Sequence, residues 1–128
     1  MRTVADVVTD ALITRPPTAT VGEARTLVRT YGIGCLPVLD ADQHPVGMLT
    51  ASDLVAPRDD ELHLSTVMTT DVITVDLDTP LRVVAATMMV NYVHHVVVVD
   101  ERGRAVGLLS AFDLLGEIAS GHVESPAH

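Results

Sequence analysis

The strongest constraint on the fold of this chain is an internal repeat at an offset of 60 residues, with no gap. The match runs from about residue 4 to 55 and again from 64 to 115. Matched pairs include Val38 with Val98, Asp40 with Asp100, Val46-Gly47 with Val106-Gly107, Leu49 with Leu109 and Asp53-Leu54 with Asp113-Leu114. A chance match is the alternative, but the identities cluster where turns and helix caps are needed. About fifty residues make a poor independent core, so we expect one domain built from two halves.

Each half has the pattern of a β-α-β-β-α unit, which gives an α/β (α+β) fold class. Thr20 with Glu23 predicts a capping box, and Thr79 followed by Pro80 predicts the start of the corresponding helix in the second half. The predicted elements are short helical turns at 4–8 and 64–68, strands at 13–14 and 72–75, helices at 20–31 and 79–91, strands at 36–39, 46–49, 96–99 and 106–109, and final helices after Thr50 and Ser110.

The predicted core is aliphatic, because hydrophobic residues make up 48% of the chain and aromatic residues only 2%. Four consecutive valines, Val96–Val99, indicate a strand that is buried on both faces. Helical spacing predicts which side chains the two longer helices bury. These are Val21, Ala24, Leu27 and Val28 in the first helix, and Leu81, Val84, Ala85 and Met88 in the second.

Composition also excludes several classes of protein. The net charge of −9 opposes binding to nucleic acid or to an anionic membrane surface. A single cysteine, Cys35, excludes an intramolecular disulfide and fits a reducing compartment. The N-terminus does not resemble a signal peptide, and the aliphatic runs are too short to span a bilayer, so we expect a cytoplasmic protein.

The sharpest local motif occurs twice, as Gly47-Met48-Leu49-Thr50-Ala51-Ser52-Asp53 and as Gly107-Leu108-Leu109-Ser110-Ala111-Phe112-Asp113. A hydroxyl residue followed three positions later by an acid at a helix start is a capping box, which is a purely structural role. The same geometry also suits a ribose phosphate. Free N–H groups at a helix start bind phosphate, and a carboxylate one turn away accepts ribose hydroxyls.

The repeat, the strand Leu36-Pro37-Val38-Leu39-Asp40 and the doubled motif resemble a tandem pair of CBS (cystathionine β-synthase) domains, a Bateman module. The resemblance implies two repeats related by a pseudo-twofold axis, with adenosine-containing ligands in clefts shared between them. The repeat itself places the first half at 1–57 and the second at 58–119, and the Gly, Ser, Pro and His residues from Ser120 onward predict a flexible C-terminal tail at 120–128. The resemblance further implies a regulatory role and a disc-shaped homodimer.

The resemblance also assigns roles to individual residues. Asp53 and Asp113 are similar to the ribose-binding carboxylates, and Thr50 and Ser110 to the hydroxyls that face ribose or phosphate. Adenine-holding segments correspond to Ile13-Thr14 and Ile73-Thr74. Because the clefts are shared, Asp113 would act with the start of the first repeat and Asp53 with the start of the second.

The pair His94-His95 resembles a His-Arg pair that meets ligand phosphates in the γ subunit of AMP-activated kinase, with His95 replacing the Arg. Protonated imidazole binds phosphate, so we expect affinity to weaken as pH rises. The alternatives are a solvated strand start or a dimer-interface pair. The corresponding positions in the first repeat are Gly34 and Cys35, and this difference favours phosphate in the cleft that contains Asp113.

Two departures from the family pattern and one cysteine bear on the ligand. Ser52 and Phe112 stand where many members have a basic residue, which disfavours tight binding of highly charged ATP. We expect AMP or ADP in preference to ATP or S-adenosylmethionine. Cys35 suggests either a metal or redox site with His95, or a buried core thiol; the spacing favours the thiol, so no metal site is expected.

Three function classes remain open at this point. The favoured one is a stand-alone regulatory protein that senses an adenine nucleotide (AMP, ADP or ATP) and acts on an unknown protein partner in trans. The second is a dimerisation or interaction module that binds no nucleotide. The third, an enzyme, is disfavoured because no histidine or cysteine sits in a recognisable catalytic motif. No cofactor is expected to be required.

Overall fold

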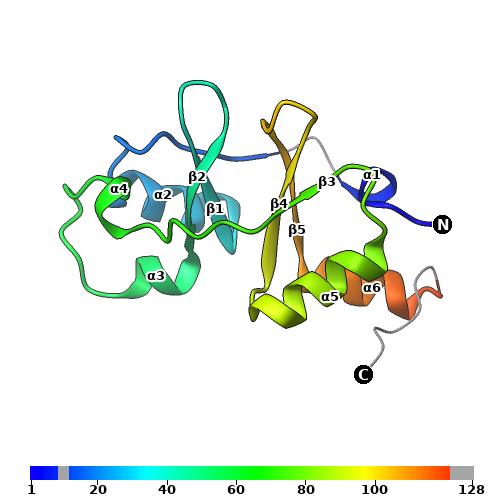
Figure 1. Ribbon diagram of the computed structural model, residues 1–128. Helices are drawn as coiled ribbons and strands as arrows, with labels where there is room; N and C mark the ends of the chain where they lie inside the picture. Colours follow the sequence, from blue (N-terminus) through cyan, green and yellow to red (C-terminus); the bar gives the residue numbers. More distant parts are fainter. Residues whose placement is uncertain (9–11, 122–128) are drawn as a thin grey trace. The chain divides into compact units, whose positions relative to one another are not determined.

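The computed structural model describes residues 1–8 and 12–121, and its element order confirms a mixed α/β fold (Figure 1). The first part of the chain contains α1 (Val4–Val7), α2 (Val21–Tyr31), β1 (Cys35–Leu39), β2 (Pro45–Thr50) and α3 (Ala51–Val55). The second part contains α4 (Leu64–Val67), β3 (Thr74–Asp76), α5 (Leu81–Asn91), β4 (His95–Val99), β5 (Ala105–Ser110) and α6 (Ala111–Ala119).

The starts of the two longer helices differ slightly from the predicted ones. The hydroxyl of Thr20 accepts the N–H of Glu23 at 3.2 Å, which is one half of the predicted capping box. Pro80, and not Thr79, is the N-cap of α5. The hydroxyl of Thr79 instead accepts the N–H of Asp76 at 3.2 Å, so it closes the preceding turn. The prediction for this helix was therefore wrong by one residue.

The predicted buried faces are present in both helices. Leu81, Val84, Ala85 and Met88 of α5 are all buried. In α2, Val21 and Ala24 are buried, while Leu27 and Val28 are partly buried against the same core. A one-sided apolar stripe at helical spacing is therefore what holds each helix to its sheet.

The strands form two small sheets with matching hairpins. In one, β1 and β2 are antiparallel, with Cys35 opposite Thr50 and Leu36 opposite Leu49. In the other, β4 pairs antiparallel with β5 and parallel with β3, so that His95 lies opposite Ser110 and Thr74 lies beside Val97. Both hairpins change register at the same place, between Val38 and Leu39 and between Val98 and Val99.

The predicted strand at Ile13-Thr14 does not form, which corrects one of the expectations. Only an isolated parallel bridge joins Arg15 to Val38. In the second repeat the N–H of Val97 donates to the carbonyl of Ile73 at 3.0 Å. Pro37 stands at the matching position and has no N–H to donate, so this ladder bond is absent from the first repeat.

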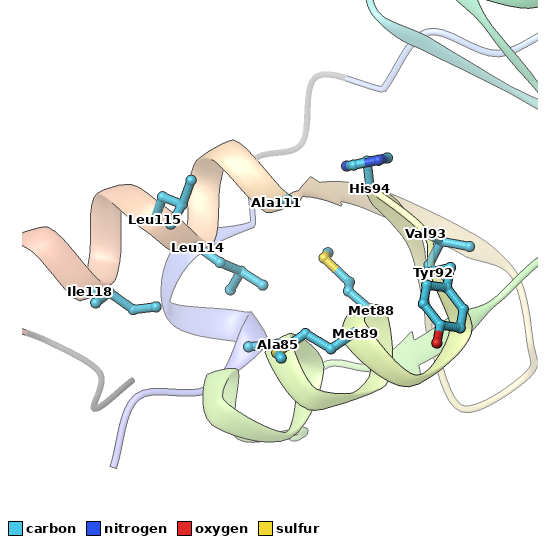
Figure 2. Close-up of a pocket in the computed structure, with 10 residues that line it drawn as sticks. All are labelled: Ala85, Met88, Met89, Tyr92, Val93, His94, Ala111, Leu114, Leu115 and Ile118. Atoms are coloured by element: carbon cyan, nitrogen blue, oxygen red, sulfur yellow. The ribbon is translucent and has the colours of Figure 1, made fainter. Parts of the chain in front are cut away.

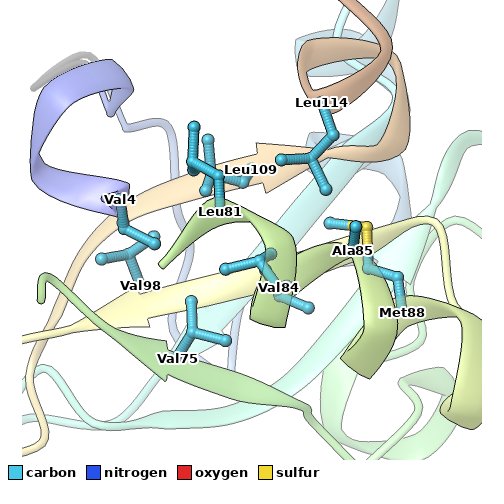
Figure 3. Close-up of a cluster of buried hydrophobic side chains, with 10 residues drawn as sticks. Val4, Val75, Leu81, Val84, Ala85, Met88, Val98, Leu109 and Leu114 are labelled. Carbon is cyan, nitrogen blue, oxygen red and sulfur yellow. The ribbon is translucent and has the colours of Figure 1, made fainter. Parts of the chain in front are cut away.

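Each sheet has its own apolar core, and each core includes the short helix that begins the other sequence repeat. Val4 of α1 is fully buried among residues of the second repeat, including Val84, Val98 and Leu109 (Figure 3). Leu64 of α4 is likewise fully buried with residues of the first repeat such as Leu36.

Backbone hydrogen bonds anchor these two exchanged helices in the same way. The N–H of Val4 donates to the carbonyl of Thr79 at 3.0 Å, and the N–H of Leu64 donates to the carbonyl of Ala19 at 2.8 Å. These four residues are related by the offset of 60. The exchange is therefore a property of the repeat and not an accident of one end of the chain.

The compact units consequently differ from the sequence repeats. One unit is Ile13–Val72, and the other joins the N-terminal segment to the part of the chain from Ile73 onward. The domain boundaries predicted at 57 and 119 remain predictions about the repeats. Most of the predicted flexible tail, residues 122–128, lies outside the described residues. No helix in the described ranges is long and apolar enough to cross a membrane, and the cytoplasmic location stays a prediction.

We expect Leu109→Ala to lower the free energy of unfolding by about 2–5 kcal/mol, because Leu109 is 2% exposed and its removal leaves a cavity. Urea denaturation followed by circular dichroism measures the change. Val55→Ala is the matched control, since Val55 is 82% exposed, and it should change the unfolding free energy by less than about 0.5 kcal/mol. Equal effects of the two substitutions would contradict the assigned core.

Candidate functional site

The first motif lies where β2 ends and α3 begins. Thr50 is the N-cap of α3, and its N–H donates to Asp53 Oδ2 at 2.8 Å. The hydroxyl of Thr50 accepts the N–H of Asp53 at 3.4 Å and donates to the same Oδ2 at 3.0 Å. It also lies 2.9 Å from the hydroxyl of Ser52.

The second motif repeats this arrangement where β5 ends and α6 begins. The N–H of Ser110 donates to Asp113 Oδ2 at 2.9 Å, and the N–H of Asp113 donates to the Ser110 hydroxyl at 3.0 Å. Both motifs are thus complete capping boxes, the structural role that the sequence allowed. Each box uses only Oδ2, and within residues 1–8 and 12–121 neither Oδ1 accepts a hydrogen bond.

The start of the preceding strand lies directly beside each cap. In the second repeat the carbonyl of His94 accepts the N–H of Ala111 at 2.8 Å, and His95 lies opposite Ser110. In the first repeat the carbonyl of Gly34 accepts the N–H of Ala51 at 3.0 Å, and Cys35 lies opposite Thr50. The structure therefore brings the predicted residues His94, His95, Ser110 and Asp113 together at one end of one hairpin.

These two strand starts differ in their electrostatics. Partial burial lowers the pKa of His95 below its usual 6.5, and the neighbouring His94 lowers it further, while the carboxylate of Asp113 acts in the opposite direction. Burial raises the pKa of Cys35 to about 12, and Asp53 adds to the rise. Cys35 is 4% exposed and is a buried core thiol. The thiolate needed for metal or redox chemistry is therefore disfavoured.

The predicted adenine-holding segments lie on the other side of the central strands. Ile73 precedes β3, which pairs with the edge of β4 opposite to β5. Ile13 and Thr14 occupy the matching place beside β1, where the N–H of Arg15 donates to the carbonyl of Pro37 at 3.3 Å. Ile13 and Ile73 are partly buried and pack against the two cores. Each compact unit thus carries one segment of this kind and one capping box.

A group of metal-ligating residues lies in the β1–β2 turn and has a structural explanation. Ligand atoms of Asp40, Asp42 and His44 lie within 4.8 Å of one another. Asp40 Oδ1 accepts the N–H groups of Asp42 and His44, both at 2.9 Å. In the turn between β4 and β5, Asp100 Oδ1 accepts the backbone N–H groups of Arg102 and Arg104 in the same way, although arginine side chains do not ligate cations. The carboxylate of Asp40 therefore stabilises the turn, and its position beside Asp42 and His44 does not require a metal ion.

A groove between α5 and α6 is a feature that the sequence reasoning missed. It has a volume of about 530 Å³ and is lined by apolar side chains, among them Met88, Met89, Tyr92, Leu114 and Leu115 (Figure 2). His94 is exposed and lines this groove, and its carbonyl accepts the N–H of Ala111 beside the Ser110 cap. The signal in the sequence was the run Met88-Met89-Val90, which has no counterpart in the first repeat.

The model of the CBS domain family matches twice, at residues 4–57 and 64–120. The chain belongs to the CBS domain family. Both halves of the internal repeat are thus CBS domains, and the doubled Gly-x-x-[Ser/Thr]-x-x-Asp motif falls inside each match.

Curated relatives support this assignment, and they differ in how much of their own length the matched region covers. The chain is 34% identical over 110 residues to inosine-5'-monophosphate dehydrogenase of Methanocaldococcus jannaschii, covering 86% of this chain but 22% of that enzyme. It is 28% identical to an uncharacterized protein of Methanopyrus kandleri, over 88% of this chain and 60% of that protein. Because the chain spans so little of the dehydrogenase, that activity does not transfer to it.

Solved structures with the same fold include a CBS domain pair. The CBS domain pair of protein MJ0100, in complex with 5'-methylthioadenosine and S-adenosyl-L-methionine, has a TM-score of 0.83 at 28% identity and covers 95% of this chain and 98% of that one. The cytosolic domain of the Mg²⁺ channel MgtE, in complex with ATP, has a TM-score of 0.77 at 27% identity over 86% of this chain and 46% of that one.

We expect the CBS pair to lose stability on acidification through His95. Its lowered pKa means that the folded state favours the neutral imidazole, so the stability present above the unfolded value of about 6.5 is lost as pH falls through the lower folded value. Melting temperatures between pH 7.5 and 5 should therefore fall less in His95→Gln than in the wild type. His63→Gln is the control, since His63 is exposed, and it should behave as the wild type does.

Proposed function

We propose that this CBS domain pair is a regulatory module that binds an adenosine-containing ligand, with AMP or ADP preferred. The observation that carries the proposal is that, among the residues that the structure describes, Oδ1 of Asp53 and of Asp113 accepts no hydrogen bond beside a completed cap. A carboxylate has acceptor capacity beyond the cap bonds, so one oxygen organises the helix start while the other is available to ribose hydroxyls. The structural and ligand-binding roles of the motif are therefore compatible.

The phosphate preference follows from the basic groups near each motif. Ser52 and Phe112, which precede the two aspartates, are both exposed and carry no charge, and Phe112 is 83% exposed. His95 lies next to the Ser110 cap with His94 beside it, and because its lowered pKa keeps the imidazole mostly neutral near pH 7, it would offer phosphate a ring N–H rather than a full charge. Few cations and a net charge of −9 favour a ligand with one or two phosphates over ATP.

The adenine base would be held by aliphatic contacts. Ile13 and Ile73 are partly buried at the edge of each core, and Thr14 and Thr74 follow them with polar side chains and backbone groups. An apolar wall with a few polar groups at its rim is the usual construction of a small-molecule site. The scarcity of aromatic residues is no obstacle to such a wall.

A second candidate ligand class is the adenosyl sulfur compounds. The support is the bound state of the MJ0100 pair, which contains 5'-methylthioadenosine and S-adenosyl-L-methionine and resembles this chain over nearly its whole length. These ligands present the same ribose to the aspartates and need no phosphate contact. They would be preferred if His95 is not a phosphate ligand.

We further propose that the module has no catalytic activity of its own, forms a homodimer and controls a protein partner in trans. The support for the lack of catalysis is that the polar side chains of both motifs form complete capping boxes. The homodimer and the partner rest on membership of the CBS domain family alone. The identity of the ligand and that of the partner are separate questions. The ligand is tested first.

Thermal unfolding with and without AMP, ADP, ATP, 5'-methylthioadenosine and S-adenosyl-L-methionine tests the proposal. A ligand at about 100 times its Kd stabilises the folded state by roughly 2.7 kcal/mol, which corresponds to a rise in Tm on the order of 8 °C for a chain of this size. We expect AMP and ADP to give the largest rise. If none of the five raises the Tm, the pair is an interaction module without a nucleotide, the alternative left open by the sequence.

Asp113→Asn and Asp53→Asn separate the ligand role from the cap. An asparagine side chain retains one oxygen to accept the N-cap N–H but loses the second carboxylate oxygen and the charge. We expect each substitution to weaken AMP binding at least tenfold in titration calorimetry, with a larger loss for Asp113→Asn because its motif lies beside His95. Equal losses would overturn this asymmetry, and unchanged affinity in both would overturn the site.

A further inference from the structure

The helix that carries Asp53 is too short to hold itself in place. α3 has five residues, so its last carbonyl groups have no N–H partner within the helix. α6, which carries the matching Asp113, has nine residues, and the carbonyls of Asp113 and Leu114 lie inside it. The first cap is also the looser one, since the N–H of Asp53 donates to its hydroxyl acceptor at 3.4 Å, against 3.0 Å for Asp113. The position of Asp53 therefore depends on support from outside α3.

Arg25 of α2 supplies that support. Its Nε donates to the carbonyl of Leu54 and its Nη2 to the carbonyl of Ala56, both at 2.8 Å. Its Nη1 donates to the carbonyl of Arg58 at 3.1 Å and pairs with the carboxylate of Asp60. A guanidinium presents its donors in a rigid plane, and its charge suits the negative end of a helix. These contacts of Arg25, here called the Arg25 latch, hold both the end of α3 and the chain that follows it.

The latch reaches Asp53 itself through Arg58. The Nε of Arg58 donates to the carbonyl of Asp53 at 3.2 Å, while Arg25 holds the carbonyl of Arg58. Two arginines thus hold the carbonyls of Asp53 and Leu54, one residue after the other. Because Asp53 Oδ2 also accepts the N–H of Thr50 at 2.8 Å, a shift of this backbone would change the position of Oδ1. The latch therefore sets the direction of the carboxylate that is proposed to bind ribose.

The connector that carries Asp60 is itself fixed to the start of α2. The N–H of Gly22 donates to the carbonyl of Asp60 at 3.0 Å, and the N–H of Val21 donates to the carbonyl of Leu62 at 2.9 Å. A Cβ at position 22 would lie 3.2 Å from the Cβ of Asp60, so glycine allows this close approach. The bonds from Arg25 to the carbonyls of α3 and Ala56 are part-buried, whereas the side chain of Asp60 is 65% exposed. The carbonyl bonds, and not the ion pair, are therefore the stronger part of the latch.

Within the part of the chain that the structure describes, the second repeat has no such latch. The offset of 60 puts Ala85 at the place of Arg25, and its methyl group has no donor. α6 runs on for another turn, and backbone hydrogen bonds close its end. Arg2 does reach α6, but it pairs with the carboxylate of Glu117 at 3.2 Å, one turn beyond Asp113. Support for the aspartate by an arginine on the helix backbone is therefore particular to the first motif.

We propose that Arg25 is a positioning residue for the carboxylate of Asp53, so that ligand affinity at the first motif depends on the latch while affinity at the second does not. The inference rests on the proposed function, because it concerns the same ribose-binding carboxylate. Coupling of this kind is reciprocal, so a ligand held by Asp53 stabilises the latched connector, residues 56–60, in return. The segment that joins the two repeats thereby responds to occupancy of one motif and not of the other.

Proton–nitrogen correlation NMR of the full chain, recorded well below its Tm, tests the proposal. The amide of Thr50 donates to Asp53 Oδ2, and the amide of Ser110 donates to Asp113 Oδ2. The two amide resonances therefore report separately on the two carboxylates in the same sample, both without ligand and during a titration with AMP.

Arg25→Met removes the guanidinium and keeps most of the apolar stem of the side chain. Without ligand, we expect it to move the Thr50 resonance and to leave that of Ser110 in place. With AMP, the affinity read from Thr50 should fall about fivefold or more, and the affinity read from Ser110 should stay within about twofold of the wild type. Arg29→Met is the matched control, since Arg29 is exposed one turn further along α2, and it should behave as the wild type does.

Three results would overturn the proposal: an unmoved Thr50 resonance in Arg25→Met, an unchanged affinity at the first motif, or equal losses at both motifs. A latch that only stabilises the fold would lower the Tm and move neither the resonance nor the affinity. If AMP moves neither resonance of the wild type, the proposed nucleotide fails, and the ligand-free shift of Thr50 still decides whether Arg25 positions Asp53. If circular dichroism shows that Arg25→Met does not fold, Asp60→Asn replaces it. That variant removes the ion pair but leaves the carbonyl bonds, so the same changes should be smaller.

Discussion

The burial of Val4 and Leu64 is the interaction on which the rest of this structure depends. Each is fully buried in a core whose sheet belongs to the other sequence repeat. Without Val4, the surfaces of Val84, Val98 and Leu109 would lose an apolar neighbour, and the same holds for Leu64 and Leu36. The sheets carry the hairpins, and the hairpins end in the two capping boxes, so the geometry of both candidate sites depends on this exchange.

Much of the fold was predictable because the repeat supplies each observation twice. The helices, the two hairpins and the caps at Thr50 and Ser110 were expected from spacing and residue type. The strand at Ile13-Thr14 was not correctly predicted, because its loss depends on a missing N–H at Pro37 in a neighbouring strand. The exchange of α1 and α4 could not be predicted from the sequence either. An apolar residue such as Val4 indicates burial, but it does not indicate which of the two cores it joins.

The candidate site shows the same division between local and tertiary information. Local spacing identified Asp53 and Asp113 and their hydroxyl partners, but not that each cap uses a single carboxylate oxygen. The lowered pKa of His95 depends on its burial and on His94, which charge counting does not capture. The α5–α6 groove was missed because helical spacing marks Ala85 only as a buried core residue. At the matching position of α2, the long side chain of Arg25 reaches α3 and donates to the carbonyl of Leu54, whereas the methyl group of Ala85 cannot reach α6 in this way.

The exchanged helices also bear on how such a chain arises. A single repeat on its own would carry a short helix with no core to enter and a core with no helix to complete it. Two separate copies would satisfy both needs by domain swapping, each lending its first helix to the other. Fusion of two such copies in one gene converts the intermolecular domain swap into a contact within one chain. It then frees the halves to diverge, as Arg25 and Ala85 have done.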